Sequence, residues 1–187
     1  MSQVFEAAPT GRSKCRGCQQ AIAAGALRFG ESLPNPFGEG EAMHWYHPPC
    51  AACKRPEALL QGLETADGVA DADALRADAQ QGLANERLTR VNGAERDPSG
   101  RAQCRHCRTS IPKGAWRVAL TFYEDGRFSP AGFLHVPCAR PYFETAAIVP
   151  RLRRFAPKLT DADVAEIEAA LQMPAPEAPA EAPPPKG

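Results

Sequence analysis

The stretch GRAQCRHCRTSIPKGAWRVA, residues 100–119, separates Cys104 and Cys107 by two residues and follows them with a strand-like run. A single Cys-x2-Cys pair is found in metal sites and in redox centres alike, so the rest of the chain has to decide between them. Residues 11–30, GRSKCRGCQQAIAAGALRFG, repeat the pattern 89 positions earlier, with Cys15 and Cys18 as the pair. The sequence therefore predicts an internal duplication.

The second half of the repeat supplies the remaining ligands of a metal site. HWYHPPC, residues 44–50, and GFLHVPC, residues 132–138, match at an offset of 88, so each copy continues with a spacer of 28 or 27 residues and His-x2-Cys. Three thiolates and one imidazole complete a tetrahedral zinc shell and leave no position open for water or substrate. The pattern predicts two structural Zn2+ ions per chain, with the ligand sets Cys15, Cys18, His47, Cys50 and Cys104, Cys107, His135, Cys138.

Other interpretations of the cysteines remain open at this stage. A redox dithiol would not need the accompanying His-x2-Cys, and seven cysteines, an odd number, do not suit a disulfide framework. Cys53 adds a second Cys-x2-Cys to the first copy, so an all-cysteine site without His47 is an alternative there. The second copy has Pro141 at that place, which favours the histidine in both copies. His44 and His106 lack counterparts in the other copy, and we expect them outside the metal sites.

The charge and the apolar runs of the chain limit its partners and its location. Lysine and arginine number 22, as do aspartate and glutamate, but basic residues outnumber acidic ones between residues 98 and 157. No apolar run reaches the roughly 18–20 residues of a membrane span, and the start, MSQVFEAAPTGRSK, has no signal-like apolar segment. We expect an intracellular protein without a membrane partner, in the cytoplasm or nucleoid of a bacterium or in the nucleus of a eukaryote.

Periodicity predicts short strands and one closing helix in each copy. Thr160, with Asp163 three residues later, has the spacing of a capping box at a helix start. The expected strands are 4–7, 26–33 and 115–123, and the expected helices are 71–83 and 160–171.

Together these elements indicate an α+β fold of two small zinc-stabilised domains, each with short antiparallel strands and a closing helix. We expect the first domain at residues 1–90 and the second at 91–172. Residues 173–187 are too rich in proline, alanine and glutamate to bury a core, so we expect a disordered tail.

The combined motifs resemble the PARP-type zinc finger, the break-sensing module of poly(ADP-ribose) polymerases and of one class of DNA ligases. The likeness lies in the Gly-Arg before the first cysteine pair, IPKG at 111–114, the arginine of the following strand and HWYH at 44–47. The resemblance covers most of residues 1–172. It implies a zinc-stabilised α+β fold that binds nicks and ends of DNA without regard to base sequence, with repair proteins as further partners.

The resemblance also assigns basic residues to the DNA backbone. Two arginines recur in register in the copies, where the family places its phosphate-binding arginines, and a guanidinium group forks well onto phosphate oxygens. These positions are Arg12, Arg28, Arg101 and Arg117. Residues that would extend the patch in the second copy are Lys113, Arg105, Arg108 and Arg127.

Apolar side chains on the loop before His-x2-Cys are expected to stack on the base pair that a break exposes. Stacking of an aromatic ring on a base is worth on the order of 1–3 kcal/mol. The candidates are Leu33, Phe37 and Met43 in the first copy and Phe122, Phe128 and Phe133 in the second. Of these, Phe37 and Phe128 are assigned to DNA contact.

The sequence contains no P-loop and no ligase-like nucleotidyl-transfer lysine motif, and we expect no enzymatic activity. IAAG replaces IPKG in the first copy, and its loop carries three glutamates, so the second copy should dominate DNA binding. The prediction is a zinc-dependent protein that recognises DNA strand breaks or ends. One alternative is a non-enzymatic adaptor whose zinc fingers no longer bind DNA, and another is a redox or zinc-responsive switch through Cys53.

Overall fold

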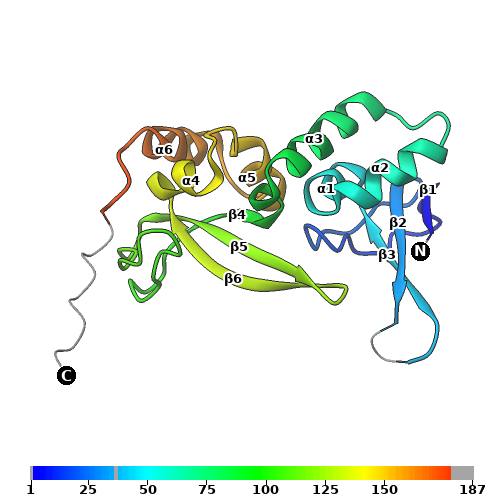
Figure 1. Cartoon of the computed structure of the whole chain (residues 1–187), viewed down its shortest axis with the longest axis horizontal. Helices are drawn as coiled ribbons and strands as arrows, with labels where there is room; N and C mark the ends of the chain where they lie inside the picture. Colours follow the sequence, from blue (N-terminus) through cyan, green and yellow to red (C-terminus); the bar gives the residue numbers. More distant parts are fainter. Residues whose placement is uncertain (1, 36–37, 178–187) are drawn as a thin grey trace, which may run out of the picture.

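The computed structural model describes residues 2–35 and 38–177, which form two modules of similar construction (Figure 1). Each module contains a three-stranded antiparallel sheet whose strands are neighbours in chain order. The first sheet is β1 (Gln3–Ala7), β2 (Leu27–Pro34) and β3 (Glu41–Tyr46), and the second is β4 (Val91–Arg96), β5 (Trp116–Glu124) and β6 (Arg127–His135). The central strands β2 and β5 begin 89 positions apart, which is the offset of the sequence repeat.

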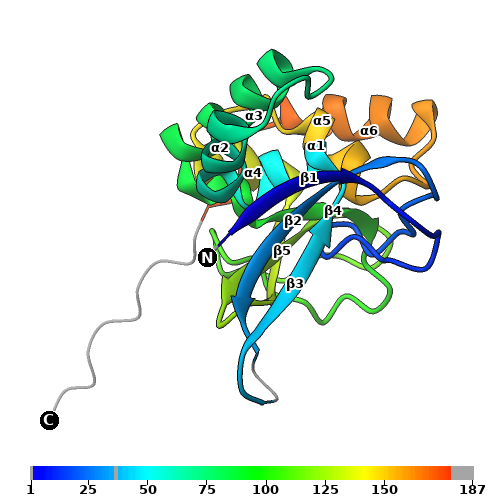
Figure 2. The same cartoon turned by 90° about the vertical axis from the view of Figure 1, so that its right-hand side faces the viewer.

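Helices cover one side of the two sheets (Figures 1 and 2). They are α1 (Pro48–Lys54), α2 (Pro56–Thr65) and α3 (Ala72–Ala84) in the first module, and α4 (Val136–Phe143), α5 (Val149–Phe155) and α6 (Asp161–Leu171) in the second. A 3-10 helix, η1 (Glu86–Arg90), leads from α3 into β4. The helices α1, α2, α4 and α5 have proline in their first turn, where its missing N–H leaves no bond unmade.

The predicted strands and closing helices are present, with ends that differ by at most one residue. The capping box is confirmed: the backbone N–H of Asp163 donates to the Thr160 hydroxyl, and the backbone N–H of Thr160 donates to the Asp163 carboxylate at 2.9 Å. The strands β3, β4 and β6 and the helices α1, α2, α4 and α5 were not predicted from the sequence. Segments such as HPPC and HVPC look like turns, yet their prolines start the helices that carry the last cysteine ligands.

Each module has its own hydrophobic core between its sheet and its helices. The first is centred on the fully buried Phe29, Tyr46 and Leu59, and the second on Leu134, Phe143 and Ile148. The two cores contact each other near the expected boundary between the modules. Leu88, which precedes the expected boundary at residue 90, belongs to the second core, whereas Phe128 and Phe155 of the second module pack against the first core.

The modules meet in an interface that we call the seam, formed by α1 and α3 against β4, β5, the β5–β6 hairpin and α5. Two buried cations cross it, each 3% exposed. Lys54 donates to the carbonyl oxygen of Val91 at 2.6 Å and to the Thr121 hydroxyl at 3.0 Å. Arg151 donates to the carbonyl oxygens of Cys53 at 3.1 Å and Asp78 at 3.0 Å. The side-chain N–H groups of both residues therefore form hydrogen bonds across the seam, which hold the modules together.

The β5–β6 hairpin forms the aromatic part of the seam, and in Figure 1 it points from the second module toward the first. The guanidinium group of Arg55 lies 3.9 Å from the ring centroid of Tyr123 while it pairs with the buried Glu31. Tyr46 meets Phe128 edge to face, with ring centroids 6.5 Å apart. The hairpin is thus docked on the first module through its side chains.

The tip of this hairpin fits closely because it carries a glycine. Gly126 has φ +74°, and a Cβ there would stand 3.4 Å from Cε1 of His44 on β3. A side chain there would have a strained backbone conformation. Its Cβ would stand at contact distance from His44, so the hairpin tip lies directly against β3.

Within residues 2–35 and 38–177, no helix is both long and apolar enough to span a lipid bilayer. The tail expected at 173–187 is described only as far as residue 177, and 173–177 form neither helix nor strand. The rest of that tail and Phe37 lie outside the described residues.

Candidate metal centres and nucleic-acid interface

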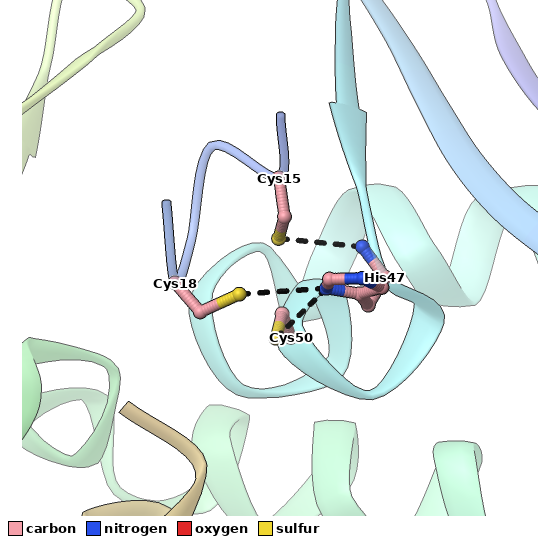
Figure 3. Close-up of side chains that lie close together, drawn as sticks. All are labelled: Cys15, Cys18, His47 and Cys50. Carbon is pink, nitrogen blue, oxygen red and sulfur yellow. Dashed lines mark hydrogen bonds between the residues drawn. The ribbon is translucent and has the colours of Figure 1, made fainter. Parts of the chain in front are cut away.

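Four ligand atoms of the first module converge on one point (Figure 3). Cys15 and Cys18 come from the turn before β2, His47 is the N-cap of α1, and Cys50 lies in its first turn. The sulfur atoms of Cys18 and Cys50 lie 3.4 Å and 4.0 Å from Nδ1 of His47, and the backbone N–H of His47 donates to Sγ of Cys15 at 3.3 Å. The four atoms lie within 4.8 Å of one another, as ligands about 2.0–2.3 Å from a shared Zn2+ require.

The second module repeats this arrangement. The sulfur atoms of Cys107 and Cys138 lie 3.4 Å and 3.9 Å from Nδ1 of His135, whose backbone N–H donates to Sγ of Cys104 at 3.4 Å. Nε2 of His135 lies 3.1 Å from the carbonyl oxygen of Ser110. Donation there keeps the proton on Nε2 and leaves Nδ1 as the metal donor.

The donor sets fit zinc in their chemistry as well as their geometry. Within the first set, hydrogen bonds from Cys18 and Cys50 lower the pKa of the Cys15 thiol, while the same hydrogen bonding raises the pKa of Cys50. In the second centre desolvation opposes ionisation, yet the hydrogen bond with Thr109 contributes to lowering the pKa of Cys107 to about 6. Thiolates are the form that binds metal. Each centre is closed by four protein ligands, so the two Zn2+ ions that they fit are structural.

Cys53, His44 and His106 are not members of either metal cluster. Cys53 is buried but is not part of the first cluster, so the all-cysteine alternative is not the arrangement seen. Burial raises the pKa of the Cys53 thiol, which makes it unreactive. His44 is buried in the seam, and His106 is exposed. Neither histidine is in a metal cluster of the described chain.

The strand arginines that the family resemblance assigns to phosphate are buried in ion pairs. Arg28 on β2 stands directly opposite Glu6 on β1 and donates to its carboxylate from Nε, at 3.1 Å, and from a terminal nitrogen. Its guanidinium group also covers the Trp45 ring at 3.5 Å. The Arg28 side chain is 7% exposed, whereas that of Glu6 is 42% exposed. The carboxylate, rather than the arginine, is thus the part that solvent reaches.

Arg117 on β5 has the same environment in the second module. It stands opposite Glu95 on β4, donates to that carboxylate from Nε at 3.0 Å, and lies 3.5 Å from the Phe133 ring centroid. The Arg117 side chain is 9% exposed and that of Glu95 is 53% exposed. Phe133, a candidate for base stacking, therefore packs under this arginine.

The two modules differ in the last partner of the arginine. Arg28 donates to the Ser13 hydroxyl at 2.7 Å, whereas Arg117 donates to the fully buried carboxylate of Asp97. Asp97 also accepts the backbone N–H groups of Ser99 and Gly100, just before the first zinc ligands. Arg117 is thus shared between two carboxylates, which lowers the positive charge that the second module can offer to a phosphate.

Other basic residues of the expected patch are open to solvent. Arg12 precedes the first cysteine pair, Arg101 precedes the second, and Lys113 lies in the IPKG turn; all three are exposed. Arg105, although exposed, donates from Nε to the carbonyl oxygen of Ala131 at 2.9 Å. Arg108, at the zinc-bound turn, and Arg127, at the start of β6, are exposed too. Most of the exposed cations of the expected patch therefore lie around the zinc-bound turns, with Arg127 on a strand.

The loop candidates separate into exposed and packed side chains. Phe122 is 45% exposed and Met43 is 37% exposed, whereas Leu33 is buried. Phe128 contacts Tyr46 and Tyr123 within the seam. The structure therefore leaves Phe122 and Met43 as the described candidates that a base can reach most easily.

The carboxylates and aromatic rings that hold the arginines were not predicted from the sequence. Glu6 and Glu95 are 89 positions apart, so the repeat itself could have revealed them, and Trp45 and Phe133 recur at an offset of 88. Asp97 has no such signal, because the first module has alanine at the corresponding position.

Comparison with known proteins identifies a relationship for the first module. Residues 6–86 match the family described as "Poly(ADP-ribose) polymerase and DNA-Ligase Zn-finger region". The chain is 26% identical over 137 residues to a poly [ADP-ribose] polymerase of Sarcophaga peregrina, an alignment that covers 64% of this chain and 14% of that protein. Over 143 residues it is 28% identical to poly [ADP-ribose] polymerase 1 of Oryza sativa subsp. japonica, covering 70% of this chain and 14% of that protein. The chain thus matches only a small part of these relatives' length.

Proposed function

We propose that this chain is a zinc-dependent DNA-binding protein that recognises strand breaks or ends. The observation that carries the proposal is the match of residues 6–86 to the zinc-finger region of poly(ADP-ribose) polymerases and DNA ligases. The two closed Cys3His centres agree with it, because they are the donor sets that such fingers need. Zn2+, when bound, fixes the turns that carry the exposed cations and takes no part in chemistry.

Phosphate binding is assigned first to the exposed cations. Arg12 in the first module and Arg101 and Lys113 in the second would contact the DNA backbone, which provides affinity without base specificity. Arg28 and Arg117 could join them by exchanging a carboxylate oxygen of Glu6 or Glu95 for a phosphate oxygen, since both carboxylates face solvent. Phosphate contacts alone cannot distinguish a break, so an exposed apolar side chain such as Met43 must provide the end contact.

The proposal includes no catalysis by these modules. A chain that performs no reaction would act by protecting DNA ends or by bringing repair proteins to them. The relatives compared come from eukaryotes, so of the compartments expected from the sequence we retain the nucleus.

The test is a comparison of a closed dumbbell duplex that contains one nick with the same dumbbell after ligation. Zinc-loaded protein is titrated against both at two salt concentrations. We expect tighter binding to the nicked dumbbell, with an affinity that falls with salt at a logarithmic slope of about 0.9 per phosphate contacted. Equal and weak binding to both would reject break recognition.

The alternative is an adaptor that binds proteins through the same modules. The observation in its favour is that Arg28 and Arg117 are already neutralised by carboxylates, in a chain with no net charge. An adaptor would bind neither dumbbell, and it would tolerate Arg101→Ala without loss of function.

A further inference from the structure

A cleft of about 400 Å³ opens on the seam, between the helices of the first module and β5 of the second. Its walls come from the start of α2, the end of α3, η1 and the end of β5. They include Pro56, Glu57, Leu83, Glu86, Arg90 and Phe122. A volume of this size lies within the roughly 300–1,000 Å³ of sites that hold small molecules or single nucleotides.

Exposed apolar side chains are concentrated in this cleft. Among the described residues, the large hydrophobic side chains that solvent reaches are Met43, Leu83, Phe122 and Met173, and two of these four line it. Phe122 is 45% exposed. Its position on the strand is nevertheless fixed through its two neighbours, since Thr121 accepts a hydrogen bond from Lys54 and Tyr123 lies under Arg55. The guanidinium group of Arg90 covers one face of the ring, so a base can stack on the part of the ring that remains exposed.

The polar groups of the cleft suit one nucleotide better than a duplex. The guanidinium group of Arg90 lies 4.6 Å from the Phe122 ring centroid and donates to the Tyr142 hydroxyl at 3.1 Å, which leaves other N–H groups of the guanidinium for a phosphate. Glu57 and Glu86 carry carboxylates that can accept from the exocyclic amino group of cytosine or adenine. The cleft is also too small for a duplex, and its lining carries the three cations Lys54, Arg55 and Arg90 beside these two carboxylates.

We infer that this cleft binds an unpaired nucleotide at a DNA break, with the base stacked on Phe122 and its phosphate at Arg90. The inference rests on the proposed function and narrows its substrate class to breaks that carry unpaired bases, such as gaps and short flaps. The site exists only because the hairpin of the second module is docked on the first, since neither module alone supplies both Leu83 and Phe122.

The experiment measures binding of the zinc-loaded full chain to two labelled dumbbells, one with a plain nick and one with a three-cytosine flap at the nick. The variants are Phe122→Ala, Phe122→Trp and the control Met173→Ala, which removes an exposed side chain away from the cleft. Zinc content and melting temperature confirm that each variant is folded. We expect Phe122→Ala to lose about 5- to 100-fold in affinity for the flap and less than about twofold for the nick. Phe122→Trp and Met173→Ala should keep the affinity for the flap.

Equal affinity of the wild-type chain for flap and nick, or an equal loss on both DNAs in Phe122→Ala, would overturn the inference while leaving break recognition intact. A single-stranded cytosine hexamer tests the cleft without any break. If the chain fails to distinguish nicked from sealed duplex but binds the hexamer through Phe122, the proposed function fails and the cleft stands. Failure to bind the hexamer as well would reject both, and the cleft would then be considered as a protein-binding site.

Discussion

Asp97 accepts a hydrogen bond from Arg117 at the place where the first module instead brings the Ser13 hydroxyl to Arg28. Each module has alanine where the other has the acceptor: at the 89-residue offset, Ala8 corresponds to Asp97 and Ala102 corresponds to Ser13. Each module thus satisfies the third nitrogen of its arginine with one partner only. The same arginine nitrogen thus has a hydroxyl acceptor in one module and a carboxylate acceptor in the other, and substitutions can test whether these acceptors are interchangeable.

We expect Asp97→Ala to lower the melting temperature of the zinc-loaded chain by about 5–10 °C, because one terminal nitrogen of the buried Arg117 guanidinium group and two backbone N–H groups lose their acceptor. Asp97→Ala/Ala102→Ser copies the solution of the first module and should recover part of the loss. Calorimetry of the single and double variants, with Ala102→Ser alone as the control, measures both effects. An unchanged melting temperature in Asp97→Ala would contradict the role given to this carboxylate.

Competition between carboxylate and phosphate for Arg117 predicts that removing the acid strengthens DNA binding. Glu95→Gln keeps the side-chain shape but weakens the ion pair, so Arg117 can turn to a phosphate more easily. We expect an affinity gain of about two- to fivefold for a nicked dumbbell at low salt, measured by fluorescence anisotropy. Glu64→Gln removes the same charge from an exposed helix position and controls for the overall field. A gain of the same size in both variants would show that Arg117 is not released.

The zinc sites predict a clear difference between the two histidines of the second module, His106 and His135. His135→Ala removes a ligand, so the purified chain should contain one zinc ion in place of two, whereas His106→Ala should retain both because that side chain is exposed and outside the cluster. Atomic absorption on purified variants gives the stoichiometry. Two zinc ions in His135→Ala would mean that another side chain completes the centre.

The sequence predicts the metal centres well because their signal is local. A Cys-x2-Cys turn and a His-x2-Cys turn each aim two ligands by short-range geometry, and the duplication removes the ambiguity that Cys53 adds. The start of α6 is equally local, since Thr160 and Asp163 bond within one turn. These features follow from spacing alone.

The surroundings of the arginines and the seam depend on contacts between distant segments. Register places Glu6 opposite Arg28, and the register is fixed only when the sheet forms. Phe128 looks like a free loop aromatic in the sequence, yet it packs against Tyr46, some 80 positions earlier. No residue near Phe128 in the sequence indicates that contact, so the sequence alone could not show that Phe128 packs between the modules.

We expect the unfolding free energy of the chain to rise as the pH rises above neutrality, because Lys54 is buried in the seam. Burial lowers the pKa of Lys54 to about 7 in the folded chain, whereas an unfolded lysine titrates near 10.4. The folded state therefore holds the proton less tightly, which costs stability at and below neutral pH and is relieved as the pH rises toward 10.4. The unfolding free energy of the wild-type chain should rise by about 2–3 kcal/mol between pH 7 and 9.5, relative to Lys54→Met.

Urea unfolding at the two pH values, with zinc in excess, measures this difference. Lys54→Met removes the titrating group and leaves the acceptors at Val91 and Thr121 unpaired. The cost of these unpaired acceptors does not depend on pH, so the informative quantity is how the stability difference between the two proteins changes with pH. Zinc ligation also varies with pH, but it does so in both proteins and cancels in the comparison. Parallel pH profiles would show that Lys54 keeps its proton in the seam, held there by its two acceptors and the rings of Phe128 and Phe155.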